Sequence, residues 1–285
     1  MKIPTLKKSD VKKLFPRRQQ NSHKGMNGKI MIVGGSIDYY GAPLLATLGA
    51  YKTGVDLVYT FVPDCNFDVS RSYYPDFIVR KFHGNYLAED AVTDIVEFSK
   101  KCDVLLIGPG IGERAGTLRA IQMILERVNI PTILDSSAIH VLTKITRVPL
   151  PQPVIITPHA NEFEMLTGKD LQNEDPIKKN QILHTVAKDL HINIVLKGEH
   201  DFITSDDGET VVNATGNAGM TVGGTGDVLA GMIASFIAQG ARPFDACKMA
   251  CFFCGAAADT LSKEKGYNYL ASEVALNLPD TIANA

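Results

Sequence analysis

The sequence predicts an α/β fold in which a mainly parallel sheet carries helices on both faces. Short apolar segments alternate with helical ones over most of the 285 residues, which is the order expected of strand-helix-strand units. The predicted strands are apolar along their whole length, as in residues 29–33 (KIMIV), and this indicates strands buried on both faces. We find no repeat and no low-complexity linker, so we expect one domain over residues 1–285.

The individual elements follow from apolar runs and from helical periodicity. Strands are expected at residues 29–33, 55–62, 103–107, 132–135, 154–156 and 193–196. Helices are expected at residues 41–54, 88–100, 117–128, 175–190, 228–239 and 244–261, with a short one from Asn161 and another after Ser272.

Late in the chain the pattern changes to a β-hairpin. Residues 201–204 and 209–213 flank the segment 205–208, which contains the Asp-Gly pair typical of tight hairpin turns. This predicts an antiparallel edge on the sheet. A TIM barrel is the alternative architecture, but the hairpin and the irregular strand spacing do not fit eight equal units.

Composition and charge exclude several classes of partner. Hydrophobic residues make up 45% and charged residues 21% of the chain, and the formal charge is -2, so we expect neither a nucleic-acid nor a membrane partner. The first 30 residues are locally basic; we interpret them as a solvated amphipathic start, with a phosphate-facing edge as the alternative. We see no signal peptide and no apolar stretch of about 20 residues, so a soluble, cytoplasmic protein is expected.

The five cysteines show no spacing typical of a disulfide framework. Cys251 and Cys254 form a C-x-x-C pair, which is compatible with metal or redox chemistry. Together with Cys247, however, they recur at helical spacing in an apolar, alanine-rich run. We therefore interpret them as one buried helix face and predict no protein metal site.

Several glycine-rich or polar segments follow the predicted strands. In an open parallel sheet, ligands bind beyond the carboxyl ends of the strands. We expect these segments to converge on one rim: residues 34–36, residues 108–112, Asp135, residues 157–159, residues 197–198 and Asn213. Taken alone, the first two are tight turns, since neither fits a known phosphate loop.

The segment 217–227 (NAGMTVGGTGD) carries the strongest chemical signal. Gly223, Gly224 and Gly226 leave the backbone bare just before a predicted helix, so the free amides there predict an anion site. A phosphoryl group in transfer spreads negative charge over its oxygens, which such amides stabilise. Asp227 then lies in the first turn, where it could accept a proton from an attacking hydroxyl. The alternative is a plain helix cap, but a cap does not need three glycines.

Two further segments are candidates for ligand contact. Pro158 would make the turn after the strand at residues 154–156, and His159 would project over the rim or serve only as a helix end. Residues 197–201 follow the next strand, either as a plain hairpin turn or as a site for nucleotide phosphate or ribose.

Together these segments resemble the ADP/ATP-dependent NAD(P)H-hydrate dehydratases, a branch of the ribokinase-like superfamily. The resemblance implies a three-layer sandwich. The matching segments are residues 28–36, 40–43, 108–112, 134–135, 157–162, 197–198 and 217–231, of which the last is the most specific.

The resemblance implies an enzyme that repairs the S form of hydrated NADH or NADPH. ADP or ATP phosphorylates the added hydroxyl, and departure of phosphate restores the reduced dinucleotide. Asp227 would be the base, and the amides of Gly224, Thr225 and Gly226 the anion site. The residues implied to contact the hydrated dinucleotide are Ala42, Gly112, His159 and Asp227. Those implied to contact the adenine nucleotide are Lys197, Gly198, Glu199, His200, Asp201 and Gly226.

The resemblance also implies Mg²⁺ bridging the nucleotide phosphates and a homo-oligomer, commonly a tetramer. Many relatives carry an epimerase domain, for which 285 residues leave no room, so we expect none here. The choice between ADP and ATP stays open. One alternative function is a ribokinase-like kinase of a vitamin precursor, which would release a stable phosphorylated product. The other is a nucleotide-binding sensor, although binding alone does not need the carboxylate of Asp227.

Overall fold

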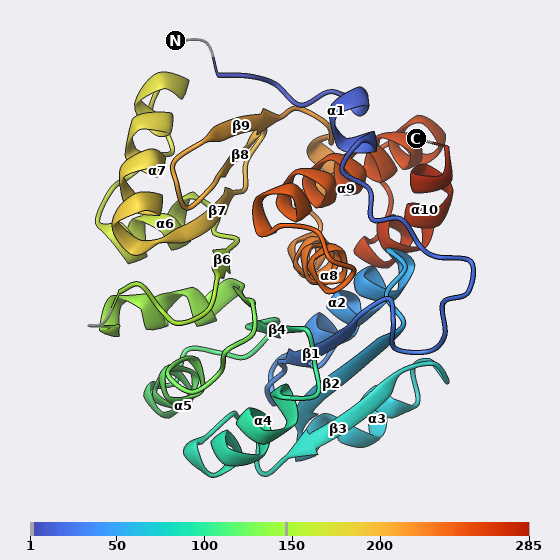
Figure 1. The fold of residues 1–285 in the computed structure, drawn as a ribbon, viewed down its shortest axis with the longest axis vertical. Coiled ribbons are helices and arrows are strands. Elements are labelled where there is room, and N and C mark those ends of the chain that lie inside the picture. Colours follow the sequence, from blue (N-terminus) through green and yellow to red (C-terminus); the bar gives the residue numbers. More distant parts are fainter. Residues whose placement is uncertain (1–2, 146–147, 285) are drawn as a thin grey trace.

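The protein is described here by a computed structural model that covers residues 3–145 and 148–284. One mixed sheet of nine strands runs through it in the order β3-β2-β1-β4-β5-β6-β7-β8-β9 (Figure 1). The strands are β1 (Lys29–Val33), β2 (Leu57–Pro63), β3 (Ile78–Phe82), β4 (Val104–Ile107), β5 (Thr132–Leu134), β6 (Val154–Ile156), β7 (Ile192–Leu196), β8 (Asp201–Thr204) and β9 (Thr210–Asn213).

The sheet is parallel from β3 to β7, and β8 and β9 add the predicted antiparallel hairpin. The chain moves outward from β1 to β2 and β3 and then returns to place β4 on the other side of β1. A crevice forms beyond the carboxyl ends of strands at such a reversal, which is where the ligand-binding segments were predicted. The open sheet excludes the TIM barrel.

Two helical layers cover the sheet, as Figure 1 shows. One contains α2 (Gly41–Lys52), α8 (Thr225–Ala238), α9 (Pro243–Lys265) and α10 (Ala271–Ala283). The other contains α4 (Val92–Ser99), α5 (Ala115–Leu125), α6 (Ala160–Thr167), α7 (Pro176–Leu190) and the 3₁₀ segment Ser136–Lys144. Alternate residues of one strand enter opposite cores: Ile30 and Ile32 face the first layer, whereas Met31 and Val33 face the second. The predicted burial of both strand faces is therefore confirmed.

Helices α2 and α8 pack unusually closely. A Cβ on Gly231 would lie 2.0 Å from the carbonyl oxygen of Ala46, and one on Gly49 would lie 2.6 Å from that of Val228. Any larger side chain at these glycines would push the helices apart. Because α8 starts at the glycine turn, this contact also fixes the position of the turn relative to α2.

The predicted elements recur with small shifts in their ends, and one strand is new. β3 was missed because Arg80 and Lys81 are exposed at the sheet edge and break the apolar pattern. α8 starts at Thr225, earlier than predicted, so it includes Asp227. The short elements α1 (Lys8–Lys12) and α3 (Phe67–Arg71) were not predicted either.

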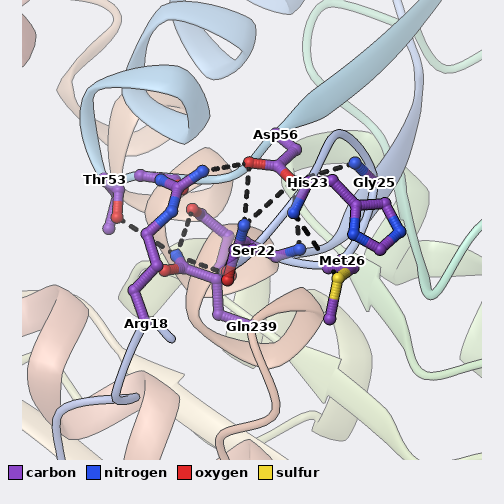
Figure 2. Close-up of polar contacts among 11 residues, drawn as sticks. Arg18, Ser22, His23, Gly25, Met26, Thr53, Asp56 and Gln239 are labelled. Atoms are coloured by element: carbon purple, nitrogen blue, oxygen red, sulfur yellow. Dashed lines mark hydrogen bonds and ion pairs between the residues drawn. The ribbon is translucent and has the colours of Figure 1, made fainter. Parts of the chain in front are cut away.

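The N-terminal segment covers the β9 edge and is tied to the opposite end of the sheet. The amide of Leu6 donates to the carbonyl of Val212 at 2.8 Å. Further along, the buried carboxylate of Asp56 accepts hydrogen bonds from the amides of Gly25 (2.9 Å) and Asn27 (3.1 Å) and pairs with Arg18 (Figure 2). Burial opposes ionisation of Asp56, but these hydrogen bonds and the Arg18 charge hold its pKa below the usual value.

The cysteine interpretation agrees with the structure. Cys247, Cys251 and Cys254 are free and buried on α9. Burial raises the pKa of Cys247 and of Cys254 to about 12, so neither thiol is reactive at neutral pH. In residues 3–145 and 148–284, no helix combines the length and apolar character that crossing a membrane needs.

Candidate active site

The glycine turn forms the N-terminus of α8. Gly224 is the N-cap, with a left-handed φ of 102° that favours glycine, and a Cβ there would lie 2.4 Å from Leu45. The first helical hydrogen bond runs from the amide of Val228 to the carbonyl of Gly224, at 3.1 Å. The amides of Thr225, Gly226 and Asp227 therefore precede the helical ladder and are directed out of its end, as an anion site requires.

Thr225 and Asp227 have different positions in this turn. The hydroxyl of Thr225 donates to the carbonyl of Met220 at 2.8 Å and so closes the turn. Any contribution of Thr225 to a ligand would therefore come from its amide. Asp227 is the third residue of α8 rather than its cap, and the structure shows no side-chain cap at this N-terminus. The alternative in which Asp227 serves as the N-cap is thus wrong.

A partly buried cation, Lys197, lies against the turn. Lys197 follows β7, and a Cβ on Gly226 would lie 3.3 Å from its Nζ. The same Nζ is 3.4 Å from Oδ1 of Asp135 and 3.9 Å from Oε2 of Glu162. Lys197 therefore connects the ends of β5 and β7 and the first turn of α6 with the start of α8.

Asp135 is the buried anchor of this group. It follows β5, is 2% exposed, and accepts a hydrogen bond from the hydroxyl of Thr157, which follows β6. A Cβ on Gly108 would lie 1.8 Å from the carbonyl oxygen of Asp135, so only glycine fits there. The next residue, Ser136, has a left-handed φ of 54°, which is strained for a residue with a side chain.

The charged groups of this site change the pKa values of Asp227 and Lys197. Burial first, and then the charge of Asp135, raise the pKa of Asp227 to about 7, while Lys197 opposes this rise. Burial alone would lower the pKa of Lys197, but Asp135, Glu162 and Asp227 together raise it. Lys197 is therefore charged at neutral pH, and Asp227 exchanges its proton near neutrality, as suits a general base.

His159 caps α6 and reaches the same region. Its Nδ1 accepts from the amide of Glu162 at 3.2 Å, and its own amide donates to Oε2 of Glu162 at 2.9 Å. A parallel bridge pairs His159 with Lys197. His159 thus has the helix-end role proposed as one alternative. Its half-exposed ring also lies 3.5 Å, from Nε2 to Oε1, from Glu162, which contacts Lys197, and the predicted ligand contact stays a prediction.

The predicted dinucleotide residues Ala42 and Gly112 follow β1 and β4. Asp135, after β5, separates them in the sheet order from His159 and Lys197, which follow β6 and β7. The turn 108–112 is wedged against residues 34–43: the amide of Gly35 donates to the carbonyl of Pro109 at 2.8 Å, and a Cβ on Gly110 would lie 3.1 Å from Cβ of Ala42. Gly112 has a φ of 80° and faces Tyr86. These glycines place the turn that holds Gly112 directly against Ala42, beyond the ends of β1 and β4.

Four of the six predicted nucleotide residues border a cavity of about 930 Å³, whereas Asp201 and Gly226 do not line it. Lys197, Gly198, Glu199 and His200 line it together with apolar residues of α7, β8 and β9 and with Ile3 and Thr5. The N-terminal residues and Leu171 were not predicted, because no pattern in the sequence brings residues so far apart together.

Asp201 faces inward instead of into this cavity. Its carboxylate accepts from the amide of Gly198 at 3.3 Å and from Nδ2 of Asn213 at 3.1 Å, and burial raises its pKa to about 6. Asp201 therefore stabilises the turn at residues 198–201, which places Glu199 and His200 at the cavity.

Comparison with known proteins identifies the family. The family model described as NAD(P)H-hydrate dehydratase matches residues 30–280. The chain belongs to this family. It is 33% identical to the ADP-dependent (S)-NAD(P)H-hydrate dehydratase of Nitrosopumilus maritimus, covering 95% of this chain and 93% of that one. It is 38% identical to the bifunctional NAD(P)H-hydrate repair enzyme of Methanocaldococcus jannaschii, over 95% of this chain but 51% of the relative. The chain thus spans about half the length of such bifunctional relatives.

Solved structures of the family agree with this fold. The ADP/ATP-dependent NAD(P)H-hydrate dehydratase of Bacillus subtilis, co-crystallised with ATP/Mg²⁺, superposes with a TM-score of 0.87 at 30% identity, over 100% of this chain and 99% of that one. A hydroxyethylthiazole kinase from Pyrococcus horikoshii shares only the fold, with a TM-score of 0.59 at 16% identity over 97% and 92% of the chains. The ribokinase-like three-layer fold predicted from the sequence is confirmed.

Proposed function

We propose that the protein dehydrates the S form of hydrated NADH or NADPH at the expense of ADP or ATP. The observation that carries this proposal is the arrangement at the start of α8. There a carboxyl group with a pKa of about 7 adjoins three outward amides and the ammonium of Lys197. The names of the relatives in archaea and in Bacillus subtilis support the same substrate and co-substrates.

In this proposal, Asp227 accepts the proton of the hydroxyl group on the hydrated ring. The hydroxyl oxygen bonds to the terminal phosphorus of the nucleotide, and the bond from that phosphorus to the bridging oxygen breaks, leaving AMP from ADP or ADP from ATP. The carbon-oxygen bond then breaks, and phosphate leaves with the electron pair. Loss of a proton from the adjacent ring carbon restores the double bond. Phosphate is the better leaving group, which is why transfer precedes elimination.

The amides of Thr225, Gly226 and Asp227 would stabilise the charge on the phosphoryl oxygens. Lys197 supplies a positive charge beside Gly226, where the transferred group would lie. The nucleotide would occupy the cavity that Lys197 to His200 border, with Asp201 holding their turn. The hydrated ring would lie between Asp227, His159, Ala42 and Gly112.

Mg²⁺ fits this site as a companion of the nucleotide. Within the described part of the chain, no three His, Cys, Asp or Glu side chains group as a protein-only metal site would require. Mg²⁺ commonly takes most of its ligands from substrate phosphates and water, so such a group is not needed. When bound, the ion would neutralise phosphate charge during transfer.

We further propose that residues 1–285 form one dehydratase domain, and that the protein works in the cytoplasm as a homotetramer. These three points rest on the resemblance. They are tested by sedimentation of the purified protein, by its location in fractionated cells, and by its activity on the separate R and S forms of the hydrate.

The decisive experiment is incubation with hydrated NADH and either ADP or ATP. Recovery of the absorbance of reduced nicotinamide, with one phosphate released per dinucleotide, is expected. Asp227→Asn should reduce turnover by about 10²- to 10⁴-fold, while nucleotide affinity measured with Mg²⁺ present changes little. A lasting phosphomonoester would instead indicate a kinase, and nucleotide binding without turnover of any hydroxylated compound would indicate a sensor.

A further inference from the structure

Three turns build the wall that carries Gly112. The amide of Ile37 donates to the carbonyl of Asn85 at 3.0 Å, and the hydroxyl of Tyr86 donates to Oδ2 of Asp38 at 3.0 Å. These contacts join residues 36–40 to residues 84–86. The turn 108–112 packs against the first of these segments through Gly110. Side chains on this wall lie on the dinucleotide side of the crevice, away from the cavity bordered by residues 197–200.

Arg114 is held against this wall by an aromatic ring. Its guanidinium lies 3.7 Å from the ring centroid of Tyr86, and its side chain is exposed. In the described part of the chain, no carboxylate lies within 4.0 Å of this guanidinium. Arg119, on the helix α5 that Arg114 precedes, instead pairs with Glu89 at 3.0 Å. Stacking uses the flat face of a guanidinium and leaves its N–H edges available.

The position of Arg114 relates it to the proposed dinucleotide site. Gly112, two residues earlier, faces the same ring, and a Cβ on it would lie 3.8 Å from Tyr86. Between Gly112 and Arg114, the carboxylate of Glu113 accepts a hydrogen bond from the hydroxyl of Ser137 at 3.3 Å, so the guanidinium edges of Arg114 are the cationic group of this segment. None of these residues lines the cavity proposed for the adenine nucleotide.

We propose that Arg114, oriented by Tyr86, binds a phosphate of the hydrated dinucleotide and so contributes to substrate affinity. This inference rests on the proposed function. The ligand is a phosphate because the planar fork of arginine matches phosphate oxygens in pairs, and a dinucleotide is long enough to place a phosphate away from its reacting ring. Two phosphates share this chemistry: the pyrophosphate present in both substrates and the 2′-phosphate found only in the NADPH form.

The test measures binding of NADH and NADPH, which carry the same phosphates as the hydrates and need no turnover. Titration of the fluorescence of reduced nicotinamide gives Kd for the wild type, Arg114→Ala and Arg119→Ala. We expect Arg114→Ala to raise Kd about tenfold, the size of one charge-assisted hydrogen bond at an exposed site. Arg119→Ala, the matched control on α5, should not change Kd. Arg114→Lys keeps the charge but loses the fork, so its Kd should lie between the two.

The pattern of effects identifies the phosphate. An equal rise in Kd for NADH and NADPH indicates the pyrophosphate, and a rise for NADPH alone indicates the 2′-phosphate. Equal Kd values for Arg114→Ala and Arg119→Ala would overturn the proposal. It would also be overturned if Arg114→Ala weakened ADP binding but left NADPH binding unchanged, or if the wild type bound neither dinucleotide. Failure of the wild type to convert either hydrated NADH or hydrated NADPH refutes the proposed function, even if the Arg114 effect on NADPH binding is found.

Discussion

The carboxylate that makes this site reactive is expected to weaken the fold. Burial, and then the charge of Asp135, raise the pKa of Asp227 from 3.8 to about 7. A carboxyl group whose pKa is higher in the folded than in the unfolded chain favours the folded state fully only below the unfolded value. That advantage is lost as the pH rises through about 7, because the folded protein must then hold a buried charge. Asp227→Asn removes this penalty.

The size of the effect follows from the pKa values. Each pKa unit corresponds to about 1.36 kcal/mol. Between about pH 5 and pH 7, two units, the wild type should lose up to about 2.7 kcal/mol relative to Asp227→Asn, with no further loss at higher pH. The neighbouring groups Asp135 and Lys197 change their interactions when the charge of Asp227 is removed. We therefore expect a measured change in the free energy of unfolding of about 1 to 2 kcal/mol.

Urea unfolding at about pH 5 and pH 8 measures this directly, with turnover followed in parallel. The variant should be the more stable protein at the higher pH and should have lost its activity there. Asp68→Asn is the control, because the Asp68 side chain is 87% exposed on α3 and has no buried charge to relieve. A difference between Asp227→Asn and wild type that is the same at both pH values would refute the reasoning.

Three other substitutions test neighbouring parts of the structure. Asp135→Asn removes the negative charge beside Asp227, so the acidic limb of the pH profile of kcat/KM should move down by about one pH unit; an unmoved limb would contradict the electrostatic account. Lys197→Met should lower kcat about 100-fold in a folded protein, as circular dichroism and single-turnover kinetics would show; near-normal kcat would remove Lys197 from the chemistry. Asp56→Ala leaves the partly buried amides of Gly25 and Asn27 without their acceptor and should cost about 2 kcal/mol in urea unfolding at neutral pH. Because the pKa of Asp56 is lowered in the folded state, the wild-type advantage should shrink as the pH falls through that pKa; a constant advantage would contradict it.

The fold could be predicted because most strands are buried on both faces. A run such as KIMIV at β1 is apolar without alternation, which fits only a covered sheet. At the β3 edge, one side of the strand meets solvent, so Arg80 and Lys81 are tolerated and the apolar signal disappears. The strand order and the N-terminal cover of β9 depend on contacts between distant segments, which local patterns do not contain.

The chemistry of the site was predictable only in part. The glycines before α8 could be interpreted from the sequence, because several glycines directly before a helix are typical of an anion site formed by backbone amides. Asp135 was visible as a residue at a strand end, but its hydrogen bond from Thr157 and its closeness to Lys197 depend on the pairing of β5, β6 and β7. For Asp201, the sequence could not indicate which side chain of the turn would point inward to Asn213.

The charges of the site also relate the protonation of Asp227 to nucleotide binding. Asp135, Glu162 and Asp227 surround the ammonium of Lys197, so the group is negative when all are ionised. Under the proposed function, this group receives an anionic nucleotide. A proton on Asp227 removes one negative charge while phosphate binds, but the base must lose that proton before it can act. Nucleotide binding without a divalent cation should therefore strengthen as the pH falls below about 7, where Asp227 is protonated. The cation carried by the nucleotide supplies opposite charge, so its presence should weaken this pH dependence. Calorimetric titration of ADP at about pH 6 and pH 8, with and without Mg²⁺, measures both effects, and identical affinities at the two pH values without Mg²⁺ would contradict this coupling.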